Sequence, residues 1–167
     1  MSKHLLRSFG LVALLLILSS TPGWATSNYE YGADEYVTVS SGISPDGKYA
    51  ITAHREGELG DQNFHLYLFD VNSGKKIGPL EEIKDTGAGA FGARWTKDSQ
   101  SVTIVYRVDR HAPLKVITYH LEGDQAKPET KEPVDVKADD PMQKFWQAHC
   151  STPRPSPKVF GTPKKKA

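Results

Sequence analysis

The sequence predicts an all-β fold of two four-stranded antiparallel sheets with one short C-terminal helix. Three observations lead to this expectation. β-Branched and aromatic residues gather in short runs, turn residues separate the runs at intervals of about ten residues, and no helical period is sustained between Tyr36 and Val136. The length of 167 residues fits one small domain.

Eight runs qualify as strands, and no helical segment separates them. The expected strands are Tyr36–Ile43, Tyr49–His54, Phe64–Val71, Lys76–Ile83, Ala90–Trp95, Ser101–Arg107, Leu114–Leu121 and Thr130–Val136. Because short connections join antiparallel neighbours, the eight strands are expected to pair in that manner.

The order of these strands repeats after about 50 residues, which is the size of a propeller blade. The turn segment 44–49 corresponds to 96–101, and the strand segment 66–71 corresponds to 116–121. In the first turn, Asp46 can bond its own backbone with its side chain. The predicted boundaries are 36–84 and 88–137 for the two copies, and 26–138 for the domain that contains them.

The segment Ser44-Pro45-Asp46-Gly47-Lys48, followed by 66–75, resembles the blade signature of WD-type and TolB-type β-propellers, and 95–99 resembles a degraded second start. The resemblance implies blade-like sheets that act mainly as interaction scaffolds, although some propellers carry enzymes. Propellers typically close with 4 to 8 blades, and two sheets alone leave one face of each without cover. We therefore expect a two-sheet monomer or weak dimer, self-association toward a ring, or docking on another protein.

The C-terminal part divides into a helix and a tail. Residues 139–150 are the helix candidate, with Asp139 or Asp140 as the cap, Pro141 in the first turn, and apolar residues at spacings of three and four. Residues 151–167 are rich in Pro and Lys and are expected to be a disordered tail. Its basic residues are either a solubilising end or a contact with an envelope protein or anionic surface component: Arg154, Lys158, Lys164, Lys165 and Lys166.

Residues 1–25 have the pattern of a secretory signal peptide, with a basic start, a short apolar run and small residues before Ala25. The apolar run is about half the roughly 20 residues that a membrane span requires. We expect a secreted or periplasmic protein with no transmembrane segment after cleavage, and an uncleaved anchor is the alternative. The 21 basic and 20 acidic residues nearly balance, so a nucleic-acid partner is not expected.

The loop joining the second and third expected strands is the longest polar insertion and the first choice for a recognition surface. Its candidate binding residues are His54, Glu56, Glu58, Asp61 and His65. These side chains could also meet a metal ion, but the loop lacks the order of a calcium loop, so a solvated acidic hairpin is favoured and no metal or cofactor is expected.

Two further features were weighed. The string Gly87-Ala88-Gly89-Ala90-Phe91-Gly92 precedes a strand and not a helix, so we interpret it as a link between the copies and not as a dinucleotide site. Cys150 is the single cysteine, and it is expected to stay unpaired or to join two chains by a disulfide. The sequence therefore predicts an exported, non-enzymatic β-repeat module that binds a protein or the envelope. The alternative is a small hydrolase or ligand-binding protein that uses the 54–65 hairpin end.

Overall fold

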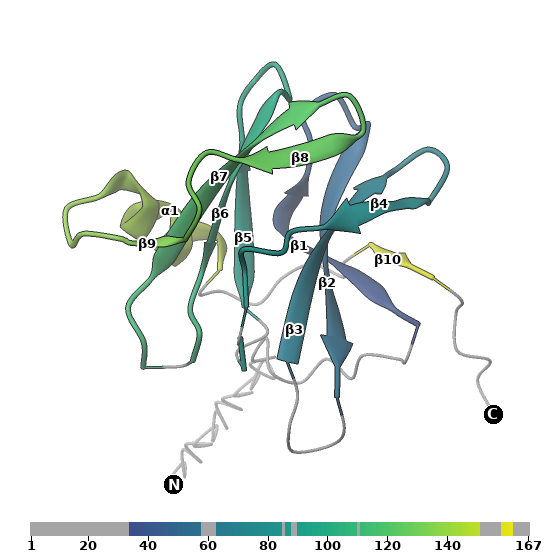
Figure 1. Cartoon of the computed structure of the whole chain (residues 1–167). Coiled ribbons are helices and arrows are strands. Elements are labelled where there is room, and N and C mark those ends of the chain that lie inside the picture. The colour runs from purple at the N-terminus through teal and green to yellow at the C-terminus, as the bar shows by residue number, and fades with distance from the viewer. Residues whose placement is uncertain are drawn as a thin grey trace, which may run out of the picture.

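The computed structural model describes residues 34–57, 63–84, 86–87, 90–109, 111–150 and 158–161. Within these residues the chain forms one curled, open β-sheet with one short helix (Figure 1). The expected mostly-β fold with a single C-terminal helix is confirmed. The expected signal segment 1–25 and most of the expected tail lie outside the described residues.

The strands form two groups of four, which we name the first unit and the second unit. The first unit contains β1 (Tyr36–Ile43), β2 (Tyr49–Glu56), β3 (Asn63–Asp70) and β4 (Lys76–Pro79). The second unit contains β5 (Phe91–Trp95), β6 (Ser101–Tyr106), β7 (Lys115–Glu122) and β8 (Gln125–Pro128). The remaining elements are β9 (Val134–Asp135), α1 (Pro141–His149) and β10 (Val159–Phe160).

The two units are joined into one sheet, which differs from the expected pair of separate sheets. The strand order is β4-β3-β2-β1-β5-β6-β7-β8, and every neighbouring pair on this path is antiparallel except β1 and β5. These two strands run parallel and meet at Ser40 and Gly92. The pairing of β1 with β5, which the sequence did not predict, therefore joins the two units into one sheet. We call this pairing the parallel seam.

This parallel seam turns the second unit over relative to the first. From β1 the first unit spreads to one side, and from β5 the second unit spreads to the other, and β2 and β3 present to the core the opposite face from that of their equivalents β6 and β7. In β2, Tyr49, Ile51 and Ala53 face the main core, and each follows the turn residue Asp46 by an odd number of residues. In β6 the core residues lie at even positions after Asp98: Val102, Ile104 and Tyr106.

The turns that precede β2 and β6 have the same hydrogen-bond pattern. In the first, the Ser44 hydroxyl donates to Asp46 Oδ1 at 2.6 Å, and the same oxygen accepts from the Lys48 amide at 3.0 Å. In the second, the Thr96 hydroxyl and the Gln100 amide donate to Asp98 Oδ1 at 2.6 and 3.1 Å. Each turn thus uses an aspartate to hold its own backbone.

Two of the expected strands differ from those observed. The strand expected over 76–83 ends at Pro79: Leu80 still donates to the Leu66 carbonyl oxygen at 2.8 Å, but its own carbonyl oxygen accepts from the Ile83 amide in a turn. The strand expected over 130–136 is wrong. A tight turn at Gly123, whose φ is 61°, instead starts β8 at Gln125, and only Val134–Asp135 pairs later, with β7.

The outer face of the second unit is covered by α1. Asp140 caps this helix by accepting from the Met142 amide at 2.8 Å, as the sequence suggests for one of the two aspartates. Met142 is buried with Val105, Leu114 and Val136. The helix end approaches β5 closely, since a Cβ at Gly92 would lie 2.5 Å from Cys150 Sγ and 3.1 Å from Phe145 Cε1.

The outer face of the first unit is covered in part by β10, where the sequence predicts a disordered tail. Val159–Phe160 pairs antiparallel with β1, and Phe160 is buried against Ala50 and Phe69. A β-branched residue followed by an aromatic one suits a strand that places its second side chain on an apolar surface. The C-terminal segment therefore supplies cover to both units.

Candidate functional site

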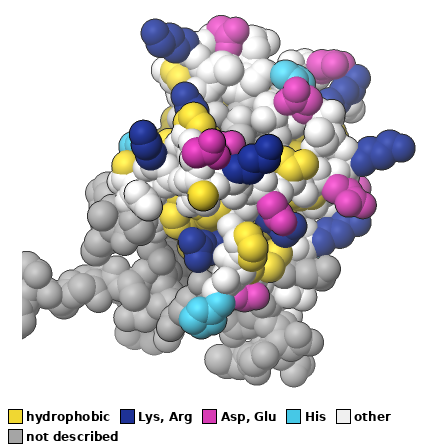
Figure 2. Space-filling model, turned by 90° about the vertical axis from the view of Figure 1, so that its left-hand side faces the viewer, with side chains coloured by type: hydrophobic (Ala, Val, Ile, Leu, Met, Phe, Trp, Pro, Cys, Tyr) yellow, Lys and Arg dark blue, Asp and Glu magenta, His cyan; other side chains and the backbone are white. Residues whose placement is uncertain are grey.

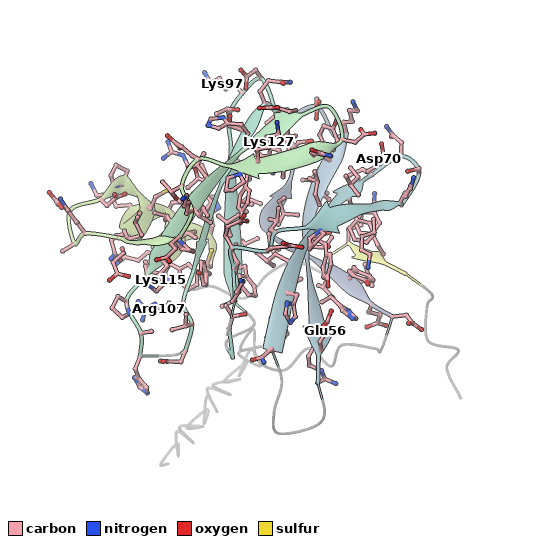
Figure 3. The ribbon with its side chains drawn as sticks, in the orientation of Figure 1. Glu56, Asp70, Lys97, Arg107, Lys115 and Lys127 are labelled. Atoms are coloured by element: carbon pink, nitrogen blue, oxygen red, sulfur yellow. The ribbon has the colours of Figure 1, made fainter. Side chains whose placement is uncertain are left out.

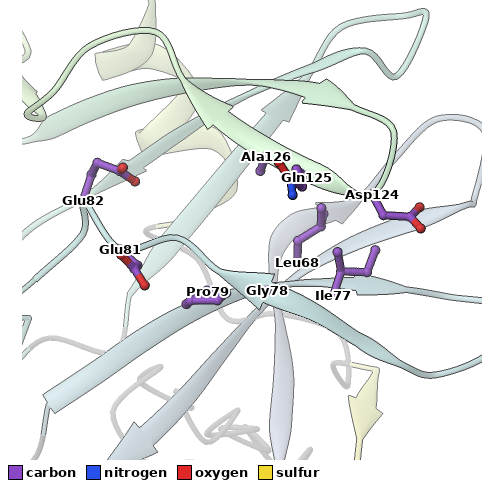
Figure 4. A pocket seen from close by; sticks show the side chains of 9 residues that line it. All are labelled: Leu68, Ile77, Gly78, Pro79, Glu81, Glu82, Asp124, Gln125 and Ala126. Atoms are coloured by element: carbon purple, nitrogen blue, oxygen red, sulfur yellow. The ribbon is translucent and has the colours of Figure 1, made fainter.

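A cleft separates the two outermost strands of the sheet, β4 and β8. The sheet curls so that these end strands approach each other (Figure 1). Their facing edges and the adjoining loops enclose about 430 Å³. The lining residues are Leu68, Ile77, Gly78, Pro79, Glu81, Glu82, Asp124, Gln125 and Ala126 (Figure 4).

The cleft is lined more by polar than by apolar surface: its rim is acidic, and a few apolar side chains lie at its base. Leu68 is almost fully buried, and Ile77 and Ala126 pack against the same main core. Glu81 and Glu82 lie on one side, in the loop after β4, and Asp124 lies on the other, in the turn before β8 (Figure 4). The rim thus carries three carboxylates from two separate segments around a hydrophobic base.

Glu82 is held in place by the core beneath it. The buried hydroxyl of Tyr119 donates a hydrogen bond to Glu82 Oε2 at 3.0 Å. Burial, together with the negative charge of Glu82, raises the pKa of Tyr119 far above its usual value, so this tyrosine remains a donor across the physiological range. The carboxylate of Glu82 is therefore oriented by a fixed partner, whereas Glu81 and Asp124 are exposed.

Both strands that border the cleft are short and end in proline. β4 stops at Pro79 and β8 stops at Pro128, and each contains four residues. Short edge strands that carry proline resist uncontrolled edge-to-edge pairing. The cleft consequently offers a few backbone groups for pairing with an extended segment, but no long open edge.

The structure places the residues proposed for the hairpin end in different environments. His54 is buried, stacks on Tyr36 at 4.4 Å between ring centroids, and has its Nδ1 2.8 Å from the Glu35 carbonyl oxygen. His65 Nε2 lies 3.7 Å from Glu56 Oε2, and this pair is largely exposed. Glu58 and Asp61 lie outside the described residues. The two histidines are thus used separately, one in packing and one at the surface.

Glu56 belongs to a small polar and aromatic cluster beside this hairpin end. It accepts a hydrogen bond from the Tyr67 hydroxyl at 2.8 Å. Lys76 Nζ lies 4.7 Å from the Tyr67 ring centroid and donates to the Tyr36 hydroxyl at 3.0 Å. Figure 3 shows Glu56 and Asp70 at opposite ends of this first unit. Because each group has a partner, we interpret the cluster as structural.

Cys150 follows the last residue of α1 and is buried, with only 4% of its surface exposed. Its sulfur lies in the tight contact with β5 at Gly92. A disulfide between two chains would require this contact to open, and the expected intermolecular link stays a prediction.

The charged groups on the side of the molecule that carries α1 form no large patch of one sign. Figure 2 shows basic and acidic side chains interspersed on this side. Of the basic tail residues, Lys158 is described: it is exposed, and its Nζ lies 5.0 Å from the Phe160 ring centroid. Arg154, Lys164, Lys165 and Lys166 lie outside the described residues.

Searches for two special kinds of feature give negative results within the described part of the chain. No group of three or more His, Cys, Asp or Glu side chains there is arranged to hold a metal ion. None of the helical segments in that part combines the length and hydrophobicity needed to cross a bilayer.

Comparison with known proteins gives no match: no family model, curated protein or solved structure is similar to this chain. The function is therefore inferred from the geometry of the chain itself.

Sequence reasoning missed the cleft. Its acidic residues are visible in the sequence, but the adjacent pair Glu81-Glu82 suggests only solubilising charge. The signal that was available is the dipeptide Gly123-Asp124, which is typical of a two-residue hairpin turn. It places β8 directly after β7, at the end of the sheet and opposite β4.

Proposed function

We propose that this protein is an exported, non-enzymatic β-repeat module that binds an envelope partner, and that the cleft between β4 and β8 holds an extended, positively charged segment of that partner. The observation that carries the proposal is the cleft itself, because it combines an acidic rim, a few apolar side chains at its base and two strand edges. Its place between the outer strands of the two units suits an interaction scaffold.

The strand edges favour an extended ligand. A peptide in β conformation can pair its backbone with an edge strand and direct alternate side chains toward the floor and the solvent. β4 and β8 are each four residues long, so each edge can pair with only a few residues. The pairing therefore anchors a short segment, and side chains must supply the remaining affinity.

The rim favours a basic ligand. Glu81, Glu82 and Asp124 provide three carboxylates without a basic residue among the cleft lining. An apolar residue of the ligand would contact Ile77 and Ala126, and a neighbouring lysine or arginine would reach the rim. Alternation of apolar and basic residues is the pattern that this arrangement would select.

The two similar turns support the interpretation of the chain as two copies of one blade-like unit. Asp46 and Asp98, 52 positions apart, accept the same set of hydrogen bonds. The turns also contact each other, since the Asp46 amide donates to the Ser99 hydroxyl at 3.2 Å. On this interpretation the cleft lies between the outer strands of two neighbouring blades.

The basic C-terminal residues would act separately from the cleft. An anionic lipid, glycan or protein surface could attract Arg154, Lys158, Lys164, Lys165 and Lys166 and hold the module near the envelope. This contact is electrostatic and is expected to weaken as salt is raised.

The cleft proposal is tested with two fluorescently labelled hexapeptides of alternating sequence, one of Lys and Val and the other of Glu and Val. The protein is expected to bind the Lys–Val peptide about five- to ten-fold more tightly, since two or three exposed ion pairs of about 0.5 kcal/mol each give roughly that factor. Fluorescence anisotropy at low and high salt measures the difference. Equal binding of both peptides, or no binding of either, would contradict the proposal.

A charge-reversal pair localises the binding. Glu81→Lys with Asp124→Lys should abolish the preference for the Lys–Val peptide and create one for the Glu–Val peptide. The matched control is Glu129→Lys with Glu132→Lys, which makes the same change of charge at exposed residues that do not line the cleft. If the control shifts the preference as much as the cleft variant, net charge and not the cleft is responsible.

A further inference from the structure

The strand β10 is held by few contacts. It contains two residues, of which Phe160 is buried while Val159 is 40% exposed. The Lys158 carbonyl oxygen accepts from the Thr38 amide at 2.9 Å and from the Thr38 hydroxyl at 2.8 Å. The Phe160 ring packs 5.0 Å from that of Phe69, measured between centroids. One aromatic anchor and one carbonyl therefore carry much of the docking.

The segment between α1 and β10 begins and ends on the same strand. The Ser40 hydroxyl donates to the His149 carbonyl oxygen at the end of the helix. The Lys158 carbonyl oxygen is bonded to Thr38. Ser40 and Thr38 are two residues apart on β1, which corresponds to about 7 Å. The described residues on either side of this segment, His149 and Lys158, therefore bind within two residues of each other on β1.

The composition of this segment opposes a short return. Residues 150–157 read Cys-Ser-Thr-Pro-Arg-Pro-Ser-Pro, with prolines at 153, 155 and 157. Proline fixes its own φ, and it also restricts the preceding residue to extended conformations. Six consecutive residues, 152–157, are thus biased toward extension. Cys150 forms the end of the helix, so the remaining residues are 151–157, and at about 3.1 Å per residue they would span roughly 22 Å if extended.

We propose that the segment Lys158–Gly161 exchanges between two copies of this chain, so that the Phe160 of each copy docks on the β1 edge and Phe69 face of the other. A second copy carries the same segment and the same receiving surface, so every contact of β10 is kept. Between two copies, the two ends of this proline-rich sequence can lie further apart than the neighbouring positions on one β1, as its composition favours. The product is a closed two-fold dimer in which each subunit completes the other.

The exchange competes with docking inside one chain. A short flexible linker gives an effective concentration in the millimolar range, and a linker whose preferred length does not match its span gives less. Exchange should therefore dominate once the protein concentration exceeds this effective concentration, which we expect to lie below about 1 mM. The proposal does not depend on the cleft, since the receiving surface lies on the outer face of the first unit.

The direct test is a disulfide between different copies. Val37 faces Val159 in the register of β1 and β10, next to the hydrogen-bonded pair of Thr38 and Lys158. A non-hydrogen-bonded antiparallel pair has its Cα atoms about 4.5 Å apart, within disulfide range. V37C and V159C are made in separate chains, both with Cys150→Ser, refolded together and oxidised. A covalent heterodimer on a non-reducing gel is expected.

Two controls make this result decisive. V37C mixed with the Cys150→Ser parent should give no such product. A single chain that carries both V37C and V159C should form the disulfide, which shows that the strand pairing survives the substitutions. If this doubly substituted chain links only within itself and the mixture of single variants gives no heterodimer, the exchange does not occur.

Molar mass in solution under reducing conditions gives an independent measurement. The protein is expected to form a reversible dimer, and replacing Pro153, Pro155 and Pro157 by Gly should weaken the dimer by at least about ten-fold in Kd, because a pliable linker favours closure within one chain. Phe160→Ala should abolish the dimer, and Val159→Thr, at the exposed position, should leave it intact. A monomer at about 1 mM, or a dimer that persists in Phe160→Ala, would overturn the proposal.

Discussion

The first and second units have the same turn between their first two strands but differ in the cover of their outer faces. In the second unit, the nine-residue helix α1 buries Met142 against three other apolar side chains. In the first unit, a two-residue strand contributes one buried ring. The comparison shows that similar sheets can depend on covers of very different size, and the predictions below measure that difference.

The largest expected effect comes from removing the anchor of each cover. Met142→Ala should reduce the free energy of unfolding by about 2–5 kcal/mol, the range for a buried methionine. Phe160→Ala should cost less, although the ring is larger, because the loss cannot exceed the docking free energy of a short segment that can detach by itself. Urea denaturation followed by circular dichroism measures both. A Phe160 variant as damaged as the Met142 variant would show that the two covers are equivalent.

The seam between the units supplies the next prediction. Gly92→Ala should reduce the free energy of unfolding by about 1–3 kcal/mol, because the added methyl group would meet Cys150 Sγ at 2.5 Å. Gly78→Ala in β4 is the matched control, since nothing lies within 4 Å of the added carbon there. Its effect should stay within about 0.5 kcal/mol. Thermal unfolding of both variants checks the difference, and equal melting temperatures would contradict the close approach of α1.

Alkaline pH should destabilise the protein by favouring ionisation of the tyrosines that the second unit buries in the core. Burial raises the pKa of Tyr106 to about 12, from a usual value of 10.0. The neutral form is favoured in the folded state, so its contribution is complete below pH 10 and is lost as the pH rises from 10 to 12. The loss is at most about 1.4 kcal/mol for each pH unit. Urea denaturation at pH 9 to 12 should show this loss of stability. The free energy of unfolding of Tyr106→Phe should depend less on pH over this range than that of the wild type.

The smallest expected effect concerns the aspartates Asp46 and Asp98 in the turn that the two units share. Hydrogen bonds from Ser44 and the Lys48 amide lower the pKa of Asp46, and those from Thr96 and the Gln100 amide lower the pKa of Asp98. A lowered pKa contributes stability above the usual value of 3.8, and this contribution is lost as the pH falls through the folded-state pKa. Asp46→Asn and Asp98→Asn should each weaken the acid dependence of unfolding below pH 4, to a similar extent. A response from only one of the two would show that the turns are not equivalent.

Several elements of the fold could be predicted because local signals determine them. The expected strand Tyr36–Ile43 has the bounds of β1, and the helix within 139–150 begins at the proline that follows its aspartate cap. The strand over 130–136 was wrong because the hairpin turn at Gly123 lies inside a polar segment with little apolar periodicity. Local patterns fix elements where capping or alternation is strong, and fail where one turn residue decides the register.

The joining of the units and the candidate site could not be predicted in this way, because both depend on contacts between distant segments. The parallel pairing of Ser40 with Gly92 leaves no local trace in either strand. The cleft arises only when β4 and β8, at opposite ends of the sheet order, approach each other. The sequence favours the 54–65 hairpin end as a binding surface, but His54 is buried there. A polar side chain in a strand can be buried when it forms a hydrogen bond, and the Nδ1 atom of His54 lies beside the Glu35 carbonyl oxygen.

The parallel seam has a consequence for assembly. The core side of β2 and β3 corresponds to the outer side of β6 and β7, so unlike faces of the two units pack on each other. Packing of unlike faces can in principle be repeated by adding further units. The outer residues Ala50 and Phe69 occupy the positions that Val102 and Tyr119 hold inside the core, so a third layer could add there as the second did. The short helix and the terminal strand cover the outer faces of the two units, where a further unit would pack. Covering these faces is expected to oppose open-ended polymerisation, as terminal caps do in solenoid proteins.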